Sequence, residues 1–155
     1  MKTRFFPSPH PSVTPPLRQF PESRRLRVAS PPPKPLLIFD GDCGFCRRWV
    51  ARWRRATGEA LDFLPFQDES AAKKYPEIPR PDFAGTLHLI FPDGSVHTGA
   101  DAVFRSLAAG GAQRRLLWCY CKLPLFAGLS EWAYRRVAAN RRFLSRLDRF
   151  ILGPS

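Results

Sequence analysis

The spacing of apolar and polar residues changes sharply near residue 40 of this chain. Residues 36–39 form a continuous apolar run between a proline and the turn residues Asp40 and Gly41. A short run bounded in this way predicts a buried strand. Beyond the turn, apolar side chains recur at helical spacing, at Phe45, Trp49, Val50 and Trp53. We therefore predict a strand, a tight turn and an amphipathic helix that ends near Gly58.

The rest of the pattern predicts a second strand, a β-hairpin and several helices. Residues 61–66 form the second strand, and a short helix over 67–75 and a loop over 76–81 follow it. The hairpin covers residues 86–98, because apolar stretches flank the turn tripeptide Pro92-Asp93-Gly94. Helices follow over residues 99–109, 112–123 and 129–150, the last as one helix or as two joined near Asn140. This last segment should pack through Leu129, Ala133, Val137, Phe143 or Leu144, Leu147 and Phe150.

The predicted order of elements is β-α-β-α-β-β-α, followed by further helices. The first two strands are separated by a helix, which favours a parallel pair, and the hairpin adds antiparallel strands to the same sheet. This order predicts an α/β fold of the thioredoxin-like type with a mixed central sheet and additional C-terminal helices. We expect it to occupy residues 36–155.

The first 35 residues differ in composition from the rest of the chain. They hold ten of the 17 prolines and seven lysines or arginines, but only one acidic residue, Glu22. Such a segment buries too little apolar surface to offset the entropy of ordering it. We predict that residues 1–35 are a disordered N-terminal extension.

The net charge of +12 adds a possible binding role to this picture. A positive field attracts nucleic acid and anionic lipid. Arginines could line one side of the last helix, with Phe143, Leu144 and Leu147 against lipid or a partner; they are Arg135, Arg136, Arg141, Arg142, Arg146 and Arg149. No nucleic-acid recognition motif accompanies the charge, so we favour a packed face and a solvated basic face, with no specific nucleic-acid partner.

The sequence predicts neither a membrane span nor a secretory signal. No apolar stretch reaches the length of about 18 residues that a membrane span needs. The N-terminal segment lacks the apolar region of a secretory signal. We expect a cytoplasmic protein without a membrane span.

Four cysteines occur as two close pairs, and the first pair stands at the predicted helix start. Close pairs are more typical of redox chemistry or metal binding than of structural disulfides. Cys43 and Cys46, in the spacing C-x-x-C, follow the strand and turn, where free backbone N–H groups and the helix dipole favour a thiolate. Arg47 and Arg48 add positive charge nearby. We predict thiol-disulfide exchange, in which Cys43 attacks, Cys46 resolves the mixed disulfide, and no cofactor is needed.

The two aspartates of the turn have several possible roles. Asp42 is placed to cap the helix, and Asp40, at the end of the strand, could accept the proton that leaves Cys46. A strand followed by Asp-Gly-Asp also resembles the nucleophile motif of haloacid-dehalogenase-type phosphatases. That motif normally has Thr or Val where this chain has Gly44, and the chain offers no convincing acidic pair for Mg²⁺.

The main alternative is a structural zinc site. Its four ligands would be Cys43, Cys46, Cys119 and Cys121. A C-x-C second pair is unusual for zinc, however, and Cys119 and Cys121 stand among apolar residues, which favours core packing. The four tryptophans, Trp49, Trp53, Trp118 and Trp132, are expected in the core as well.

LLIFDGDCGFC at residues 36–46, followed by an arginine-rich helix, resembles the DCC-type, YuxK-like thiol-disulfide oxidoreductase family. Asp40, Cys43 and Cys46 match the family's Asp-Cys-Cys pattern. FLPFQDE at 63–69, GADAV at 99–103 and EWAYRRVAANR at 131–141 resemble later family segments, so the likeness covers about residues 36–145.

The resemblance implies a thioredoxin-like fold and disulfide exchange with a protein or small-molecule disulfide or dithiol, together with an unidentified electron donor or acceptor. Thioredoxins place a proline, usually cis, before the third strand, and its backbone binds substrate. Here that region reads FAGTLHL, and we expect Gly85 and Thr86 to take its place.

Overall fold

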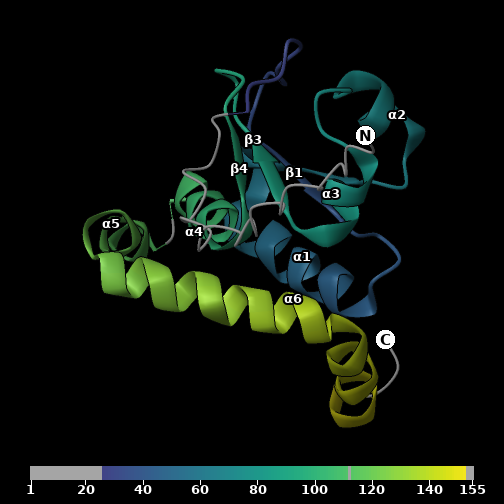
Figure 1. Cartoon of the computed structure of the whole chain (residues 1–155), viewed down its shortest axis with the longest axis vertical. Coiled ribbons are helices and arrows are strands. Elements are labelled where there is room, and N and C mark those ends of the chain that lie inside the picture. The colour runs from purple at the N-terminus through teal and green to yellow at the C-terminus, as the bar shows by residue number, and fades with distance from the viewer. Residues whose placement is uncertain (1–25, 112, 153–155) are drawn as a thin grey trace, which may run out of the picture.

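The structure is a computed structural model and describes residues 26–111 and 113–152. Four strands form one mixed sheet in the order β2-β1-β3-β4 (Figure 1). The strands are β1 (Leu36–Phe39), β2 (Asp62–Pro65), β3 (His88–Ile90) and β4 (Val96–Thr98). β1 pairs in parallel with β2 and antiparallel with β3, and β3 and β4 form the predicted hairpin. The predicted mixed sheet is confirmed.

Six α-helices and one 3₁₀ helix occupy the rest of the described chain. They are α1 (Gly44–Thr57), η1 (Gly58–Ala60), α2 (Glu69–Lys74), α3 (Arg80–Gly85), α4 (Gly99–Ala109), α5 (Arg114–Lys122) and α6 (Pro124–Leu152). α1 ends at Gly58, whose φ of 52° is in the left-handed region that glycine tolerates best. The arrangement is a thioredoxin-like α/β fold with additional C-terminal helices.

β1 lies in the middle of the sheet and is buried on both faces, which explains its continuous apolar run. Leu36 and Ile38 face one core cluster, together with Tyr75, Ile78, Phe83, Ile90 and Val96. Leu37 and Phe39 face the other, which includes Val50, Trp53, Leu61, Leu89 and Ala102. Helices α1 and α4 cover this second face, and α6 lies against both of them (Figure 1).

The segment before β1 packs on the domain, whereas the sequence placed it in the extension. The Val28 amide donates to the Gly94 carbonyl at 3.0 Å, and the Val96 amide donates to the Leu26 carbonyl at 3.0 Å. Val28 is buried in the first core cluster, so these contacts bind residues 26–28 to the hairpin. The predicted disorder of residues 1–25 lies outside the described residues.

α3 begins at Arg80, whereas the sequence predicted a loop over residues 76–81. Its proline, Pro81, is in the first turn. A proline costs little there, because the amide it lacks would have no partner within the helix. A proline that looked like a loop signal therefore lies at a helix start. Pro124 likewise stands at the start of α6, which the sequence had predicted to begin at residue 129.

α6 is one continuous helix, and its predicted inner face is wrong at Leu129 and Phe143, whereas Ala133 and Val137 line a pocket between α6 and α1. Leu129 and Phe143 are each 64% exposed, and Ala133 and Val137 are exposed too. The inner face also carries Glu131, Tyr134 and Arg141, whose polar groups bond to the domain. Arg141 thus lies opposite the exposed arginines Arg135 and Arg136 rather than in one row with them. Side chains of Arg142 and of residues 145–152 lie outside the described part.

The tryptophans also depart from the prediction. Trp53 is buried in the core, but Trp49, Trp118 and Trp132 are 43%, 60% and 54% exposed. α5 contains no fully buried residue, and its Leu116 and Trp118 are exposed. Among the described helices, none combines the length and the apolar character needed to cross a membrane.

A dithiol beside an apolar pocket

Three segments meet at one edge of the sheet. β1 and β2 are parallel, with Phe39 opposite Pro65, so the residues that follow them emerge side by side. β3 runs antiparallel to β1, so the residues that precede it reach the same edge. This topology brings Asp40, Gln67 and Thr86 to the start of α1, where the cysteine pair lies.

Cys43 is the N-cap of α1, with extended backbone angles of φ −80° and ψ 108°. Its Sγ accepts a hydrogen bond from the Cys46 amide at 3.3 Å, the role that an oxygen usually fills at a helix start. The predicted capping by Asp42 is therefore wrong. Asp42 is exposed, and its amide donates to Asp40 Oδ1 at 3.1 Å, which closes the turn. The predicted C-x-x-C pair at a helix start is confirmed.

Cys46 lies one turn further along α1 and is partly buried. Burial raises the pKa of the Cys46 thiol well above its usual value, and the adjacent Cys43 sulfur raises it further. The positive charge of Arg141 acts in the opposite direction, and the Asp40 carboxylate adds to the rise. The environment of Cys46 therefore favours its thiol form over its thiolate form.

Asp40 is held by a side chain that the sequence analysis did not assign. Gln67 donates through Nε2 to Asp40 Oδ1 at 2.7 Å and accepts from the Gly41 amide at 2.9 Å. A Cβ on Gly41 would lie 2.8 Å from the Pro65 Cβ and 3.0 Å from Gln67 Oε1, so only glycine fits this close approach. Gln67 belongs to the FLPFQDE segment, and its position just after β2 was the only signal for it.

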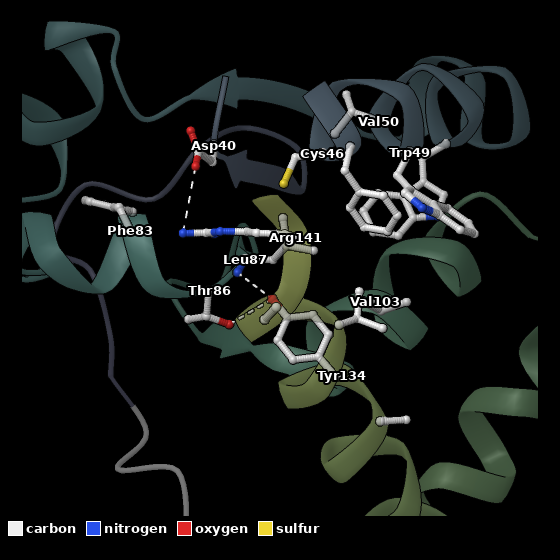
Figure 2. A pocket seen from close by; sticks show the side chains of 15 residues that line it. Asp40, Cys46, Trp49, Val50, Phe83, Thr86, Leu87, Val103, Tyr134 and Arg141 are labelled. Atoms are coloured by element: carbon white, nitrogen blue, oxygen red, sulfur yellow. Dashed lines mark hydrogen bonds and ion pairs between the residues drawn. The ribbon is translucent and has the colours of Figure 1, made fainter. Parts of the chain in front are cut away.

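Helix α6 supplies three polar side chains that attach it to the domain. Arg141 donates to the Ala84 carbonyl and lies 3.9 Å from Asp40 Oδ2. The Tyr134 hydroxyl accepts from the Leu87 amide at 2.9 Å and bonds to the Thr86 hydroxyl at 3.0 Å (Figure 2). Burial raises the pKa of Tyr134, so it stays neutral and available for both bonds.

The third attachment is Glu131. Its Oε1 accepts from the Tyr120 hydroxyl at 2.7 Å and from the Asp101 amide at 3.3 Å, in the first turn of α4. An anion at a helix N-terminus is favoured by the dipole, so Glu131 stabilises the end of α4 from another helix. None of the three attachments follows from apolar periodicity, although all three residues lie in the EWAYRRVAANR segment.

An apolar pocket with a volume of about 280 Å³ lies between α1 and α6, and Cys46 is part of its wall (Figure 2). Thr86 lines the pocket as well, at the position that the sequence analysis compared with the thioredoxin proline. None of the described residues has a cis peptide bond. The other lining residues are Asp40, Phe45, Trp49, Val50, Trp53, Phe83, Leu87, Val103, Ala133, Tyr134, Val137, Ala138 and Arg141.

The second cysteine pair lies elsewhere, on α5. Cys119 is half-buried and Cys121 is exposed, so the prediction that both pack in the core fails for Cys121. Within residues 26–111 and 113–152, which include all four cysteines, no three potential ligands of the His, Cys, Asp or Glu type come together. The four cysteines of the alternative zinc site thus do not come together in the described structure.

The family model for DCC1-like thiol-disulfide oxidoreductases matches residues 37–147. The chain belongs to this family. The match spans the dithiol, the sheet, Gln67 and the described attachments of α6, so it covers the whole site. Comparison with curated proteins found no match, and comparison with solved structures found none either. Membership of the DCC1-like family indicates thiol-disulfide oxidoreductase activity.

Proposed function

We propose that this DCC1-like protein catalyses dithiol-disulfide exchange, with Cys43 as the attacking thiolate and Cys46 as the resolving thiol. The observation that supports this assignment is the hydrogen bond from the Cys46 amide to Cys43 Sγ at the N-terminus of α1. A sulfur that accepts an N–H at a helix start carries negative charge at lower cost. Cys46, in contrast, is held as a thiol by burial.

The exchange proceeds in two balanced steps. The Cys43 thiolate attacks one sulfur of a substrate disulfide, the S–S bond breaks, and the released thiolate takes up a proton. Cys46 then loses its proton and attacks Cys43 Sγ, which releases the second substrate thiol and leaves a Cys43–Cys46 disulfide. The protein dithiol loses two electrons and the substrate gains them. The reverse sequence would oxidise a substrate dithiol.

Asp40 is proposed as the acceptor of the Cys46 proton. Its carboxylate is close enough to raise the pKa of Cys46, and Gln67 and Arg141 fix its orientation. Arg141 lowers the pKa of Cys46, so it favours the thiolate once the proton has moved. The site therefore contains an acceptor for the proton and a cation for the sulfur that loses it.

A trapping experiment tests the order of the two thiols. The Cys46→Ser variant, incubated with a disulfide substrate, should accumulate a mixed disulfide at Cys43, because the resolving step is blocked. Mass spectrometry of a tryptic digest identifies the modified cysteine. The matched control is Cys121→Ser, which should turn over without accumulating the adduct. A mixed disulfide on Cys119 or Cys121, or none on any cysteine, would contradict the proposal.

A further inference from the structure

The pocket beside the dithiol has a polar end and a long apolar wall. Asp40 and Arg141 lie toward one side in Figure 2, Trp49 and Val103 lie toward the other, and the Cys46 sulfur is between them. Arg141 and Asp40 already neutralise each other, so the pocket offers no free charge to a ligand. Three aromatic rings, from Phe45, Trp49 and Trp53, form much of the remaining wall. Such a wall favours an apolar group attached close to a sulfur.

The size of the pocket limits what can enter it. A cavity of about 150 Å³ is enough to hold benzene, and ligand sites for small molecules begin near 300 Å³. At about 280 Å³, this pocket suits one aromatic ring or a branched aliphatic group. Trp49 remains 43% exposed, so the wall that it forms reaches solvent.

Backbone groups with which a polypeptide substrate could pair are already hydrogen-bonded to side chains of α6. An extended peptide binds a domain of this kind by pairing its main chain with free backbone N–H and C=O groups. Just before β3, the Leu87 amide is bonded to Tyr134, and the Ala84 carbonyl is bonded to Arg141. Side chains of α6 therefore take two hydrogen bonds that a peptide main chain could otherwise make at this place.

We propose that the pocket binds the apolar organic group of a low-molecular-weight disulfide, and that the protein prefers such disulfides to polypeptide disulfides. This inference rests on the proposed function. Cys43 attacks the sulfur that carries the pocket-bound group, the S–S bond breaks, and the other half leaves as a thiolate that is protonated by water. Cys46 then attacks Cys43 Sγ, gives up its proton, and releases the apolar thiol.

The substrate test compares three disulfides of similar intrinsic reactivity. They are benzyl 2-hydroxyethyl disulfide, bis(2-hydroxyethyl) disulfide and a short hydrophilic peptide cyclised by one disulfide. Dithiothreitol returns the Cys43–Cys46 disulfide to the dithiol after each turnover, and each kcat/KM is divided by the rate of the same disulfide with free dithiothreitol. The benzyl compound should exceed both others by about tenfold or more, which is the discrimination that a hydrophobic pocket supplies for a small apolar group.

A pocket-filling variant tests whether the pocket is the cause of the preference. Ala133→Leu adds bulk to the pocket wall from an exposed position of α6, so it should not disturb the core. It should lower kcat/KM for the benzyl compound about tenfold more than kcat/KM for the hydroxyethyl compound. Ala51→Leu is the matched control, because Ala51 is exposed on α1 and does not line this pocket.

A binding measurement separates the pocket from the exchange reaction. Benzyl methyl sulfide has no S–S bond, so it can bind but cannot react. It should change the fluorescence of the tryptophans in the wall, Trp49 and Trp53, and Ala133→Leu should weaken this binding about tenfold while Ala51→Leu should not.

The outcomes distinguish the two proposals. Equal normalised rates for the three disulfides, a faster peptide, or an equal loss on all substrates in Ala133→Leu would overturn the pocket assignment and leave disulfide exchange standing. Absence of exchange with every disulfide would overturn both. A benzyl preference that disappears in Ala133→Leu, with matching loss of thioether binding, would support both.

Discussion

The two cysteine pairs of this chain differ in their spacing and in their position within a helix. Cys43 and Cys46 lie at the N-terminus of α1, where one sulfur accepts a backbone N–H and the other lines a pocket. Cys119 and Cys121 lie within α5, a helix without a buried residue. Residues three apart share one face of a helix, whereas residues two apart point to different sides. Spacing and position in the helix, rather than the presence of two thiols, make the first pair suited to exchange.

The largest expected effect comes from removing the first sulfur. Cys43→Ser should lower disulfide exchange by about a thousandfold or more, because the attacking atom is lost. The double variant Cys119→Ser, Cys121→Ser should retain activity within twofold. The measurement is the steady-state rate with bis(2-hydroxyethyl) disulfide and dithiothreitol as the reductant, alongside circular dichroism to confirm folding. Comparable losses in the two variants would remove the distinction between the pairs.

A smaller effect is expected from the carboxylate beside the first pair. Asp40→Asn keeps the shape and one oxygen for Gln67 but loses the proton acceptor, so the resolving step should slow about a hundredfold. Formation of the Cys43 mixed disulfide should stay within a few-fold of wild type. Rapid-quench measurement of the mixed disulfide separates these steps. Raising the pH should partly restore the variant, because hydroxide can take the proton instead; a pH-independent defect would argue for a purely structural role.

The smallest effect concerns how the buried thiol titrates. Alkylation requires the thiolate, and burial raises the pKa of Cys46, so its thiolate fraction at neutral pH is low. In Cys43→Ser, iodoacetamide should modify Cys46 at least about tenfold more slowly than the exposed Cys121 at pH 7. The Cys46 rate should still rise tenfold per pH unit above pH 8.5, the ordinary cysteine pKa. Peptide mass spectrometry follows each site; a Cys46 plateau near pH 8.5 would contradict the assigned environment.

Local pattern was enough to predict the elements that hold the dithiol. The apolar run of β1, the turn and the amphipathic spacing of α1 are all encoded within about 20 neighbouring residues, and α4 was predicted with the bounds that the structure has. The hairpin followed from the residues of its turn. Features that depend on residues close in the sequence could therefore be predicted.

Features that depend on residues far apart in the sequence could not be predicted from local pattern. Arg141 looked like one of many arginines in a basic helix, yet it bonds to Ala84, 57 positions away, and approaches Asp40. Gln67 had no local pattern that would link it to Asp40. The prediction for the inner face of α6 failed at Leu129 and Phe143, because the attachments of this helix are polar and those two side chains stay exposed. Hydrogen bonds between distant segments leave no periodic signal in the sequence.

The attachment of α6 also sets the order in which the site can be assembled during synthesis. A chain leaves the ribosome from its N-terminus, so β1, α1 and both active thiols emerge well before Tyr134 and Arg141. Until α6 docks, the pocket lacks one wall and the backbone at Leu87 lacks its hydroxyl partner. The wall that α6 supplies is therefore the last part of the pocket to be synthesised.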